Sequence, residues 1–407
     1  MFKCHQSTRA ISRRRMFPYL LLSPDTYVAL QVIGTLPLAA SELEDAVQRL
    51  ICMACWWGLS ASMFESDRHN FSAACAQLCL FPLPSTPLLD LFVSPLDFSW
   101  KPWSSRVPFT EIEASKVSKD NSLIPTVDTL RHEHLIRCMV LSSRSILLCG
   151  PPGSGKSMSI SSALSSFPDV TVVHLSFSSS TQPSLIMKAL EHNCSVTRTP
   201  SGLVMRPHNL SNRLVLFCDE VNLPAADIFG TQTAISLLRQ LLQFGGFWRP
   251  HDASWIRLEQ VHLIAACNPA GDSGRTALPD RFLRHVLVLH VDFPSRQSIE
   301  IIYGSFTRAL MRLVPSMRSF APLLCDAMVE LHFRVISKCT RALQDHYVFS
   351  PRDLSRWVRG IFEIVDESDG GLSPEDLVRF WAHEALRLCV TLLFCKHVKC
   401  MQSYSFF

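Results

Sequence analysis

The segment at residues 145–157 constrains the fold of this chain more than any other part of its sequence. Four apolar residues, Ile146 to Cys149, predict a buried strand. They lead directly into Gly150-Pro-Pro-Gly-Ser-Gly-Lys-Ser157, which fits the phosphate-loop pattern of Gly, four residues and Gly-Lys-Ser. Residues 158–167 contain no Pro or Gly and predict a helix. A strand, a glycine loop and a helix in this order predict an α/β fold that binds a nucleoside triphosphate; the alternative is a turn without a ligand.

The residue types of this loop match the chemistry of phosphate binding. Glycines let successive backbone N–H groups turn toward phosphate oxygens, and the helix N-terminus adds a partial positive charge. The lysine reaches the outer phosphates, and the serine hydroxyl ligates Mg²⁺. We therefore predict a nucleotide-binding loop made of Gly150, Pro151, Pro152, Gly153, Ser154, Gly155, Lys156 and Ser157.

Length and composition fit a globular chain with more than one domain. The 407 residues allow two or three domains, and a net charge of +4 is only mildly basic. Arg13 to Arg15 form a short basic block, which we interpret as a solvated tail, with a targeting or nucleic-acid patch as the alternative. The 15 Cys are mostly scattered, which favours free thiols in a reducing compartment.

Two other interpretations of the N-terminal part are open. Cys52 and Cys55, followed by Cys75 and Cys79, loosely resemble a zinc-binding pair of pairs, but the first two lie in an apolar helix-like run where Cys acts as a core residue. Residues 16–40 are apolar but interrupted by proline, so we expect no membrane span; a signal peptide is the alternative.

The order of apolar segments predicts a five-stranded parallel sheet flanked by helices, followed by a small helical domain. Strands are expected at residues 146–149, 170–177, 214–217, 261–267 and 285–291. Helices are expected at residues 41–64, 183–192 and 234–244, and a further helix is expected to end near residue 140. Hairpins are expected at 196–205 and at 247–259, the second with its turn at 250–254. Residues 81–108 are rich in Pro and aromatics and predict a packed, extended connector. Beyond 294 we expect helices, two of which start with Ser-Pro-x-Asp at Ser350 and Ser373.

Polar residues follow two of these strands. Asp219 and Glu220 end the third strand, where Asp219 would hold Mg²⁺ and Glu220 would polarise the attacking water. Asn268 follows the fourth strand and can hydrogen-bond the outer phosphate or the water. In isolation, a solvated strand end and a turn-forming Asn before Pro269 are the alternatives, but the preceding phosphate loop favours function.

Two arginines are candidates for neutralising transition-state charge, and a third could swing onto the nucleotide as the two domains close. Arg281 or Arg284, just before the fifth strand, could be presented to a neighbouring subunit's phosphate, or could be surface cations. Arg352 opens a helix of the second domain, where Arg356 and Arg359 are equally placed by position alone.

At this point the chain resembles the dynein heavy chain family, specifically the third AAA+ module of the motor ring, and the cytoplasmic form most closely. The runs that carry the resemblance include Ile124-Pro-Thr-Val-Asp-Thr-Leu-Arg-His-Glu133, the phosphate loop, Leu214-Val-Leu-Phe-Cys-Asp-Glu-Val-Asn-Leu-Pro224, Gly230-Thr-Gln, Leu238-Arg-Gln, Ala266-Cys-Asn-Pro269, Arg281-Phe-Leu-Arg-His285, Ser350-Pro-Arg352, Arg356-Trp-Val-Arg-Gly-Ile-Phe362 and Trp381-Ala-His-Glu-Ala-Leu-Arg387.

The resemblance implies a role for each matching residue. Lys156 and Ser157 match Walker A, with Ser in place of the usual Thr, while Asp219 and Glu220 match Walker B. Asn268 matches the first sensor and Arg352 the second. Arg281 or Arg284 matches a finger that points into the preceding module's site, and Ile124 and Pro125 match the loop near adenine. The implied cofactors are ATP or ADP and Mg²⁺, and the two hairpins match inserts of this clade.

The resemblance also implies an organisation along the chain. Residues 1–41 are unassigned, 42–119 end the preceding module and form a connector, 120–293 form the large α/β domain, 294–388 form the helical lid, and 389–407 are unmatched. The family would continue with a fourth module, a microtubule-binding stalk and further modules, so we expect a piece of a motor, such as a fragmentary gene product.

At the level of function, the resemblance implies a slowly hydrolysing ATP-binding module that regulates a minus-end-directed microtubule motor. Its expected partners are other AAA+ modules, and, only through a full-length motor, intermediate and light chains and microtubules in the cytoplasm. A nucleotide-gated interaction module that does not hydrolyse ATP, or a non-functional fragment, is the alternative, because the neighbour's arginine finger is missing from this chain. We expect neither membrane nor nucleic-acid binding, since basicity is mild.

Overall fold

The computed structural model describes residues 40–78, 86–94, 97–108, 110–113, 117, 123–200, 202–209, 213–249, 252–272, 274–340, 347–367 and 373–393. The chain folds into two compact units. Unit 1 comprises Met1–Arg106, Arg131–Pro151 and Gly155–Asp292, and unit 2 comprises Val107–Leu130, Pro152–Ser154 and Phe293–Phe407.

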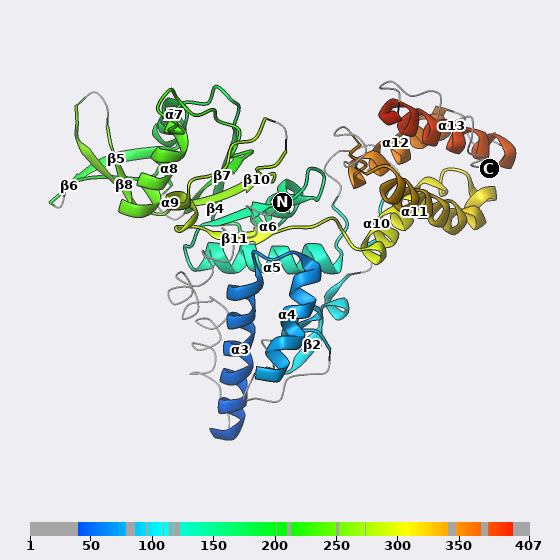
Figure 1. Cartoon of the computed structure of the whole chain (residues 1–407), viewed down its shortest axis with the longest axis horizontal. Helices are drawn as coiled ribbons and strands as arrows, with labels where there is room; N and C mark the ends of the chain where they lie inside the picture. Colours follow the sequence, from blue (N-terminus) through cyan, green and yellow to red (C-terminus); the bar gives the residue numbers. More distant parts are fainter. Residues whose placement is uncertain are drawn as a thin grey trace. The chain divides into compact units, whose positions relative to one another are not determined.

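The centre of unit 1 is a parallel sheet with the strand order β11-β3-β10-β7-β4. Four of its strands, β4, β7, β10 and β11, are labelled in Figure 1. Its strands are β3 (Ile146–Cys149), β4 (Val170–Ser176), β7 (Arg213–Asp219), β10 (Val261–Cys267) and β11 (Leu287–His290). The predicted five-stranded parallel sheet is therefore confirmed. Because all strands run the same way, the residues that follow them come together at one edge.

Helices cover both faces of this sheet, as a parallel sheet requires. The helices of this part are α5 (Val127–Leu141), α6 (Lys156–Ser165), α7 (Pro183–Asn193), α8 (Thr233–Phe244) and α9 (Asp280–Leu283). Side chains of α7, α8 and α9 pack with one set of strand residues into a single apolar cluster. Side chains of α5 and α6 pack with the alternate set, which faces the opposite side.

The N-terminal part of unit 1 packs on the α5–α6 side. It contains α3 (Ala40–Ser60), α4 (Glu65–Leu78), β1 (Leu91–Val93), β2 (Trp100–Pro102) and two 3-10 turns, Leu88–Asp90 and Trp103–Arg106. Trp56 and Trp57 of α3 belong to the same apolar cluster as α5 and α6. The connector prediction was incomplete, because β1 and β2 pair as an antiparallel hairpin within it. Helix α4 was not predicted; it is mostly polar and lacks a clear apolar stripe.

A second, four-stranded sheet in unit 1 has the order β5-β6-β9-β8. Its strands are β5 (Cys194–Thr199), β6 (Gly202–Pro207), β8 (Gly246–Trp248) and β9 (Trp255–Leu258). Both predicted hairpins are confirmed as antiparallel pairs, although Pro250 and His251 of the second turn lie outside the described residues. The parallel pairing of β6 with β9, which joins the hairpins, was not predicted.

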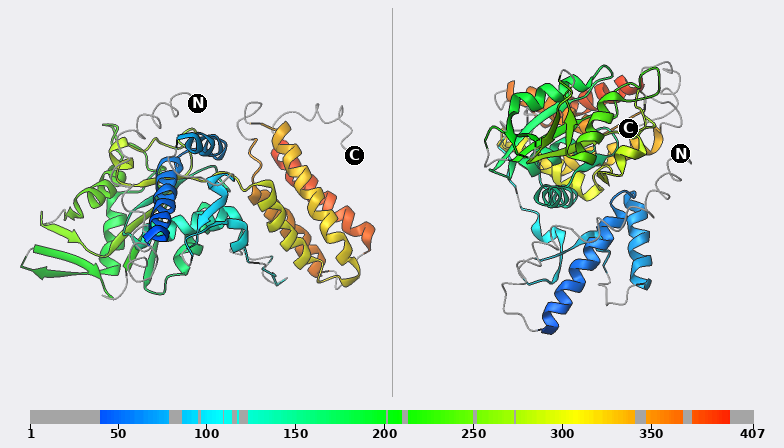
Figure 2. Two further views of the ribbon diagram at one scale, coloured as in Figure 1. Left: turned by 90° about the horizontal axis from the view of Figure 1, so that it is seen from below. Right: turned by 90° about the vertical axis from the view of Figure 1, so that its left-hand side faces the viewer.

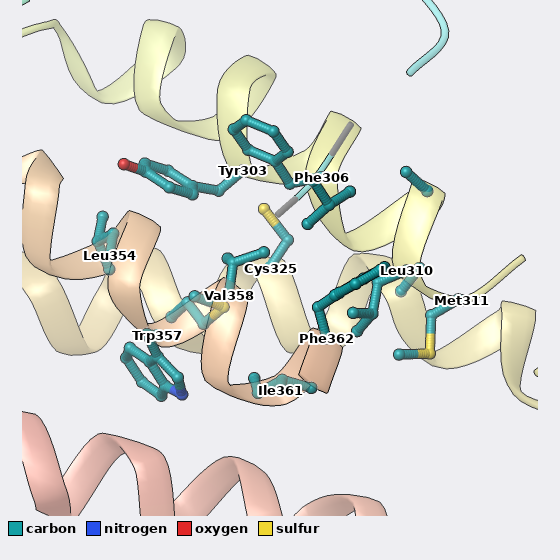
Figure 3. Close-up of a cluster of buried hydrophobic side chains, with 14 of the residues drawn as sticks. Tyr303, Phe306, Leu310, Met311, Cys325, Leu354, Trp357, Val358, Ile361 and Phe362 are labelled. Atoms are coloured by element: carbon teal, nitrogen blue, oxygen red, sulfur yellow. The ribbon is translucent and has the colours of Figure 1, made fainter. Parts of the chain in front are cut away.

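Unit 2 is helical, as expected beyond residue 294. It contains α10 (Arg296–Leu310), α11 (Ala321–Lys338), α12 (Pro351–Glu367), α13 (Pro374–Leu393) and the 3-10 helix Pro315–Phe320. These helices, coloured yellow to red, pack side by side in Figure 2. Figure 3 shows the core between them, where Tyr303 and Phe306 of α10 face Trp357 and Phe362 of α12. No helix in the described part of the chain has the length and apolarity needed to cross a membrane.

The starts of α12 and α13 follow the predicted capping signals. The Asp353 Oδ2 atom accepts from Ser350 N at 2.9 Å and from Ser350 Oγ at 3.1 Å. At α13, Asp376 N donates to Ser373 Oγ at 3.2 Å, and Ser373 Oγ donates to Asp376 Oδ2 at 2.7 Å. Each Ser and Asp pair therefore satisfies polar groups at a helix N-terminus that would otherwise lack partners.

Candidate nucleotide site

The phosphate loop joins β3 to α6 and has the backbone that its glycines predict. Gly153 has φ +85° and Gly155 φ +83°, in the region that side chains disfavour. A Cβ at Gly153 would lie 2.9 Å from Ser350 Oγ, so glycine is also needed there for space. Helix α6 begins at Lys156, earlier than the predicted residue 158, and Gly155 is its N-cap. The N-terminus of a helix thus directly follows the loop, as anion binding requires.

The Lys156 side chain is buried beneath the loop. Its Nζ donates to the carbonyl oxygens of Gly150 and Pro151, each at 2.8 Å. Burial lowers the pKa of Lys156, and nearby anionic groups, including the carboxylate of Asp219, oppose that shift. A lysine held at the base of the loop can exchange these carbonyl contacts for phosphate oxygens.

Ser157 and Asp219 lie next to each other, although they are far apart in the sequence. Ser157 Oγ donates to Asp219 Oδ2 at 2.9 Å. The first turn of α6 positions the serine, and the end of β7 positions the carboxylate. A hydroxyl and a carboxylate are hard oxygen ligands of the kind that Mg²⁺ prefers. The pair therefore fits a magnesium site beside the phosphate loop, with Ser157 and Asp219 as its protein ligands.

Glu220 reaches the same sheet edge because its backbone adopts an unusual conformation. Its φ is +59°, in the left-handed region, and its N–H donates to Asp219 Oδ1 at 3.0 Å. Side chains alternate along a strand, so a turn directly after Asp219 is what brings both carboxylates to one edge. Non-glycine residues in this region are strained and cluster at functional sites.

Asn268, the first residue after β10, contacts Glu220. Asn268 Nδ2 donates to Glu220 Oε1 at 3.5 Å, a long hydrogen bond. The Asn268 side chain is buried, and its backbone carbonyl accepts from Asn222 Nδ2 at 2.8 Å. The amide and the carboxylate can therefore position one water molecule together.

Sequence reasoning missed two residues of this edge. Arg275, in the loop after β10, forms an ion pair between its Nη1 and Glu220 Oε2. Asn222 is almost fully buried and links the segment after β7 to Asn268. Asn222 lies in the run Leu214 to Pro224 that carries the resemblance, but no role was assigned to it. Arg275 gave no signal because it lies on an irregular loop.

The two candidate finger arginines belong to α9 and its C-cap. Arg281 and Arg284 are both exposed. Arg284 Nε donates to His285 Nε2 at 3.1 Å. Their exposure fits an arginine that is presented to another surface, and the choice between them stays open.

The remaining candidates belong to unit 2. Ile124 is buried in the apolar core of that unit, and Pro125 is half-buried. Arg352 is exposed on the first turn of α12, whereas Arg356 Nη1 contacts Asp353 Oδ1 at 3.3 Å. A Cβ at Gly153, which also belongs to unit 2, would lie 3.8 Å from the Cβ of Arg352. The backbone of Gly153 and the side chain of Arg352 are therefore close together.

The zinc interpretation gains no support from the described residues. Cys52 and Cys55 lie on α3 and are half-buried, and Cys52 packs against the core. Cys79 lies outside the described residues. Among the residues that are described, no group of three or more His, Cys, Asp or Glu side chains could hold a metal ion. The stretch of the signal-peptide alternative, residues 13–39, also lies outside the described part.

A phosphate loop before α6, carboxylates at the end of β7, an asparagine after β10 and a helical unit after the sheet define a P-loop AAA+ module. The comparisons with known families assign it further. A family model described as "P-loop containing dynein motor region" matches residues 111–294. Models for a dynein heavy chain ATPase lid domain and a dynein heavy chain AAA lid domain match residues 306–397 and 16–105.

Curated relatives agree with these matches. The chain is 46% identical over 361 residues to "Dynein heavy chain, cytoplasmic" of Dictyostelium discoideum, covering 88% of this chain and 8% of that protein. The proteins of the same name from Drosophila melanogaster and Caenorhabditis elegans are each 43% identical, over 86% and 85% of this chain. The chain belongs to the dynein heavy chain family. It spans 8% of the length of these relatives. The lid models begin at residue 16 and end at residue 397, so they extend into both end segments for which the resemblance gave no match.

Proposed function

We propose that this chain binds ATP or ADP together with Mg²⁺ at the edge formed by the phosphate loop, β7 and β10. The observation that carries the proposal is the 2.9 Å contact between Ser157 Oγ and Asp219 Oδ2 directly after the glycine loop. When bound, Mg²⁺ would neutralise phosphate charge, with Ser157 and Asp219 as its ligands. The loop N–H groups and Lys156 would bind the phosphates.

Equilibrium binding of labelled ATP and ADP, with and without Mg²⁺, tests this proposal. Wild-type chain should bind in a magnesium-dependent way, and Lys156→Ala should bind much more weakly. Lys188→Ala is the matched control, because Lys188 is exposed on α7, which packs on the opposite face of the sheet from α6. A folded wild-type chain that takes up neither nucleotide, or a Lys156→Ala chain that binds like wild type, would refute the proposal.

We further propose that Glu220 acts as the general base and that hydrolysis by the isolated chain is slow. Two features support slow turnover. An arginine finger presented by a neighbouring module contributes about 10³ to 10⁵ in rate, so the chain assayed without other modules should turn over slowly. Arg275 also pairs with the carboxylate that the water needs. Steady-state hydrolysis by wild type should be low but above that of Glu220→Gln, and equal rates would remove the enzymatic part of the proposal.

A nucleotide-gated interaction module is the second candidate, and the Arg275–Glu220 ion pair favours it. In that case nucleotide binding would order the chain without turnover. It predicts magnesium-dependent binding together with equal, background hydrolysis by wild type and Glu220→Gln.

Within a full-length motor, we propose that this chain corresponds to the third module of the ring and regulates minus-end-directed movement along microtubules in the cytoplasm. The relatives' names support only the cytoplasmic dynein heavy chain part of this proposal, and the choice of the third module rests on the sequence runs that carry the resemblance. Its partners would be the other AAA+ modules, and, through the complete motor, intermediate and light chains. The exposed Arg281 or Arg284 would serve the preceding module's site.

Placing Arg281→Ala and Arg284→Ala separately into a complete heavy chain tests that assignment. One of them should slow hydrolysis at the preceding site while leaving nucleotide binding to this module unchanged. If neither changes hydrolysis anywhere in the ring, the finger assignment fails, and a non-functional fragment becomes the better description of the isolated chain.

A further inference from the structure

Two cysteines and a histidine end three adjacent strands of the central sheet. Cys149 of β3 lies directly opposite Cys267 of β10 and directly opposite His290 of β11. Residues in register on neighbouring strands of a parallel sheet point to the same face. Cys149 is therefore the middle member of a row of three reactive side chains.

The register places the two thiols at a separation that a disulfide can span. Neighbouring strands lie about 4.8 Å apart, and disulfides join residues whose Cα atoms are about 4.4–6.8 Å apart. Both cysteines are free thiols in this structure. Cys149 is half-buried, whereas Cys267 is almost fully buried. One thiol of the pair is thus partly accessible and the other is shielded.

The surroundings of Cys149 favour its thiolate. Hydrogen bonding to Cys267, opposed by burial and supported by His290, lowers the pKa of Cys149 to about 5. Burial would lower the pKa of His290, but its hydrogen bond to Asp292 and the neighbouring Cys149 outweigh burial and raise it to about 9. His290 Nε2 and Asp292 Oδ1 are 2.9 Å apart. A carboxylate therefore holds an imidazolium beside the thiol.

Other cysteines of the described sheet and lid have the opposite environment. Cys218, on β7, is fully buried, and burial together with the charge of Asp219 raises its pKa. Burial raises the pKa of Cys325, in the core of unit 2, to about 11. These thiols lack the partly exposed, electropositive setting that makes a cysteine reactive.

We propose that Cys149 is a peroxide-reactive thiol and that Cys267 is its resolving partner, so that oxidation closes a disulfide between β3 and β10. In the first step the Cys149 thiolate attacks one oxygen of a hydroperoxide. The O–O bond breaks, the sulfur becomes a sulfenic acid, and the leaving oxygen takes the proton of the His290 imidazolium. With hydrogen peroxide, the leaving group departs as water.

In the second step Cys267 attacks the sulfur of the sulfenic acid. The S–S bond forms, the S–O bond breaks, and the oxygen leaves as water with the thiol proton. Two thiols are thereby oxidised and one hydroperoxide is reduced. The bond would link the residue before Gly150, where the phosphate loop starts, to the residue before Asn268. This oxidation does not depend on nucleotide binding, because the oxidation state of each cysteine is measured directly.

Peptide mass mapping of the purified, reduced full-length chain after treatment with hydrogen peroxide tests the proposal. The expected product is a peptide pair joined through Cys149 and Cys267 that dithiothreitol separates. Cys149 should lose its free thiol at least about tenfold faster than Cys325, because the thiolate is the reacting form.

Two serine variants and one control separate the steps. Cys267→Ser should leave a sulfenic acid on Cys149 that dimedone traps, and Cys149→Ser should leave Cys267 reduced. Cys325→Ser, the matched control, should oxidise like wild type. Dimedone trapping at Cys149 in the wild-type chain provides the same readout should a variant fail to fold.

Three results would overturn the proposal. One is oxidation of Cys149 no faster than that of Cys325. Another is oxidation of Cys267 at the wild-type rate in Cys149→Ser. The third is a disulfide from Cys149 to a different cysteine, such as Cys218.

Discussion

Replacing Gly155 with alanine isolates the backbone contribution of the phosphate loop. Gly155 has φ +83° and ψ +10°, and no atom lies within 4 Å of the Cβ that alanine would add. The cost is therefore conformational and not a clash. A left-handed backbone conformation costs a residue with a Cβ about 1–2 kcal/mol. We expect this cost to appear either as an equal loss in the free energy of unfolding or as a loss of nucleotide affinity. Because about 1.4 kcal/mol corresponds to a tenfold change, the loss of affinity would be roughly 5- to 30-fold.

Both quantities can be measured on one preparation, by urea unfolding and by equilibrium binding of labelled ADP with Mg²⁺. Gly58→Ala is the matched control, because Gly58 lies inside helix α3, has no positive φ and also has open space around its Cβ. It should stabilise the chain by up to about 1 kcal/mol, as alanine is the better helix former. A Gly155→Ala chain with both the wild-type unfolding free energy and the wild-type ADP affinity would refute this reasoning.

Three further predictions concern the site and the lid. Ser157→Ala removes the hydroxyl that contacts Asp219, so we expect ADP affinity to fall in the presence of Mg²⁺ and to change little in EDTA; calorimetry under both conditions would show it. Trp357→Ala removes a side chain that is 1% exposed and leaves a cavity in the core of unit 2. It should lower the free energy of unfolding, measured by urea titration, by about 3–5 kcal/mol. Burial, opposed by the charge of Asp353, lowers the pKa of His332 from 6.5 to about 4, so the unfolded chain binds a proton that the folded chain excludes. The free energy of unfolding should therefore fall as pH drops from 6.5 toward 4, and it should fall less steeply in His332→Leu. Thermal unfolding at each pH would measure this.

The sheet and its polar edge were predictable because their signals are local. An apolar run that ends in a glycine loop, or in two carboxylates, indicates a parallel strand whose end faces the ligand. Strand alternation also required a turn at Glu220, and the structure has one there, although only the coordinates reveal its left-handed backbone.

Features that depend on distant partners were not predictable. The ion pair of Arg275 with Glu220 joins an irregular loop to the end of a strand, and no periodic pattern in the sequence indicates that these two residues meet. The short strands β1 and β2 are stabilised by pairing with each other and carry too few residues for alternation to be seen. Helix α4 is placed by its surroundings, because its Arg68 donates to the backbone carbonyls of Ala61 and His290.

The parallel pairing between β6 and β9 has a consequence for how the chain acquires its structure. Leu203 pairs with Ile256, and β7 and α8 lie between these residues in the sequence. The first hairpin can close on its own during synthesis, but its partner strand emerges only after β7 and α8. Contacts between distant segments slow folding, because a long loop must close before they form. The smaller sheet should therefore mature late, and a ribosome-bound chain ending before Trp255 should leave one edge of β6 unpaired and open to mispairing.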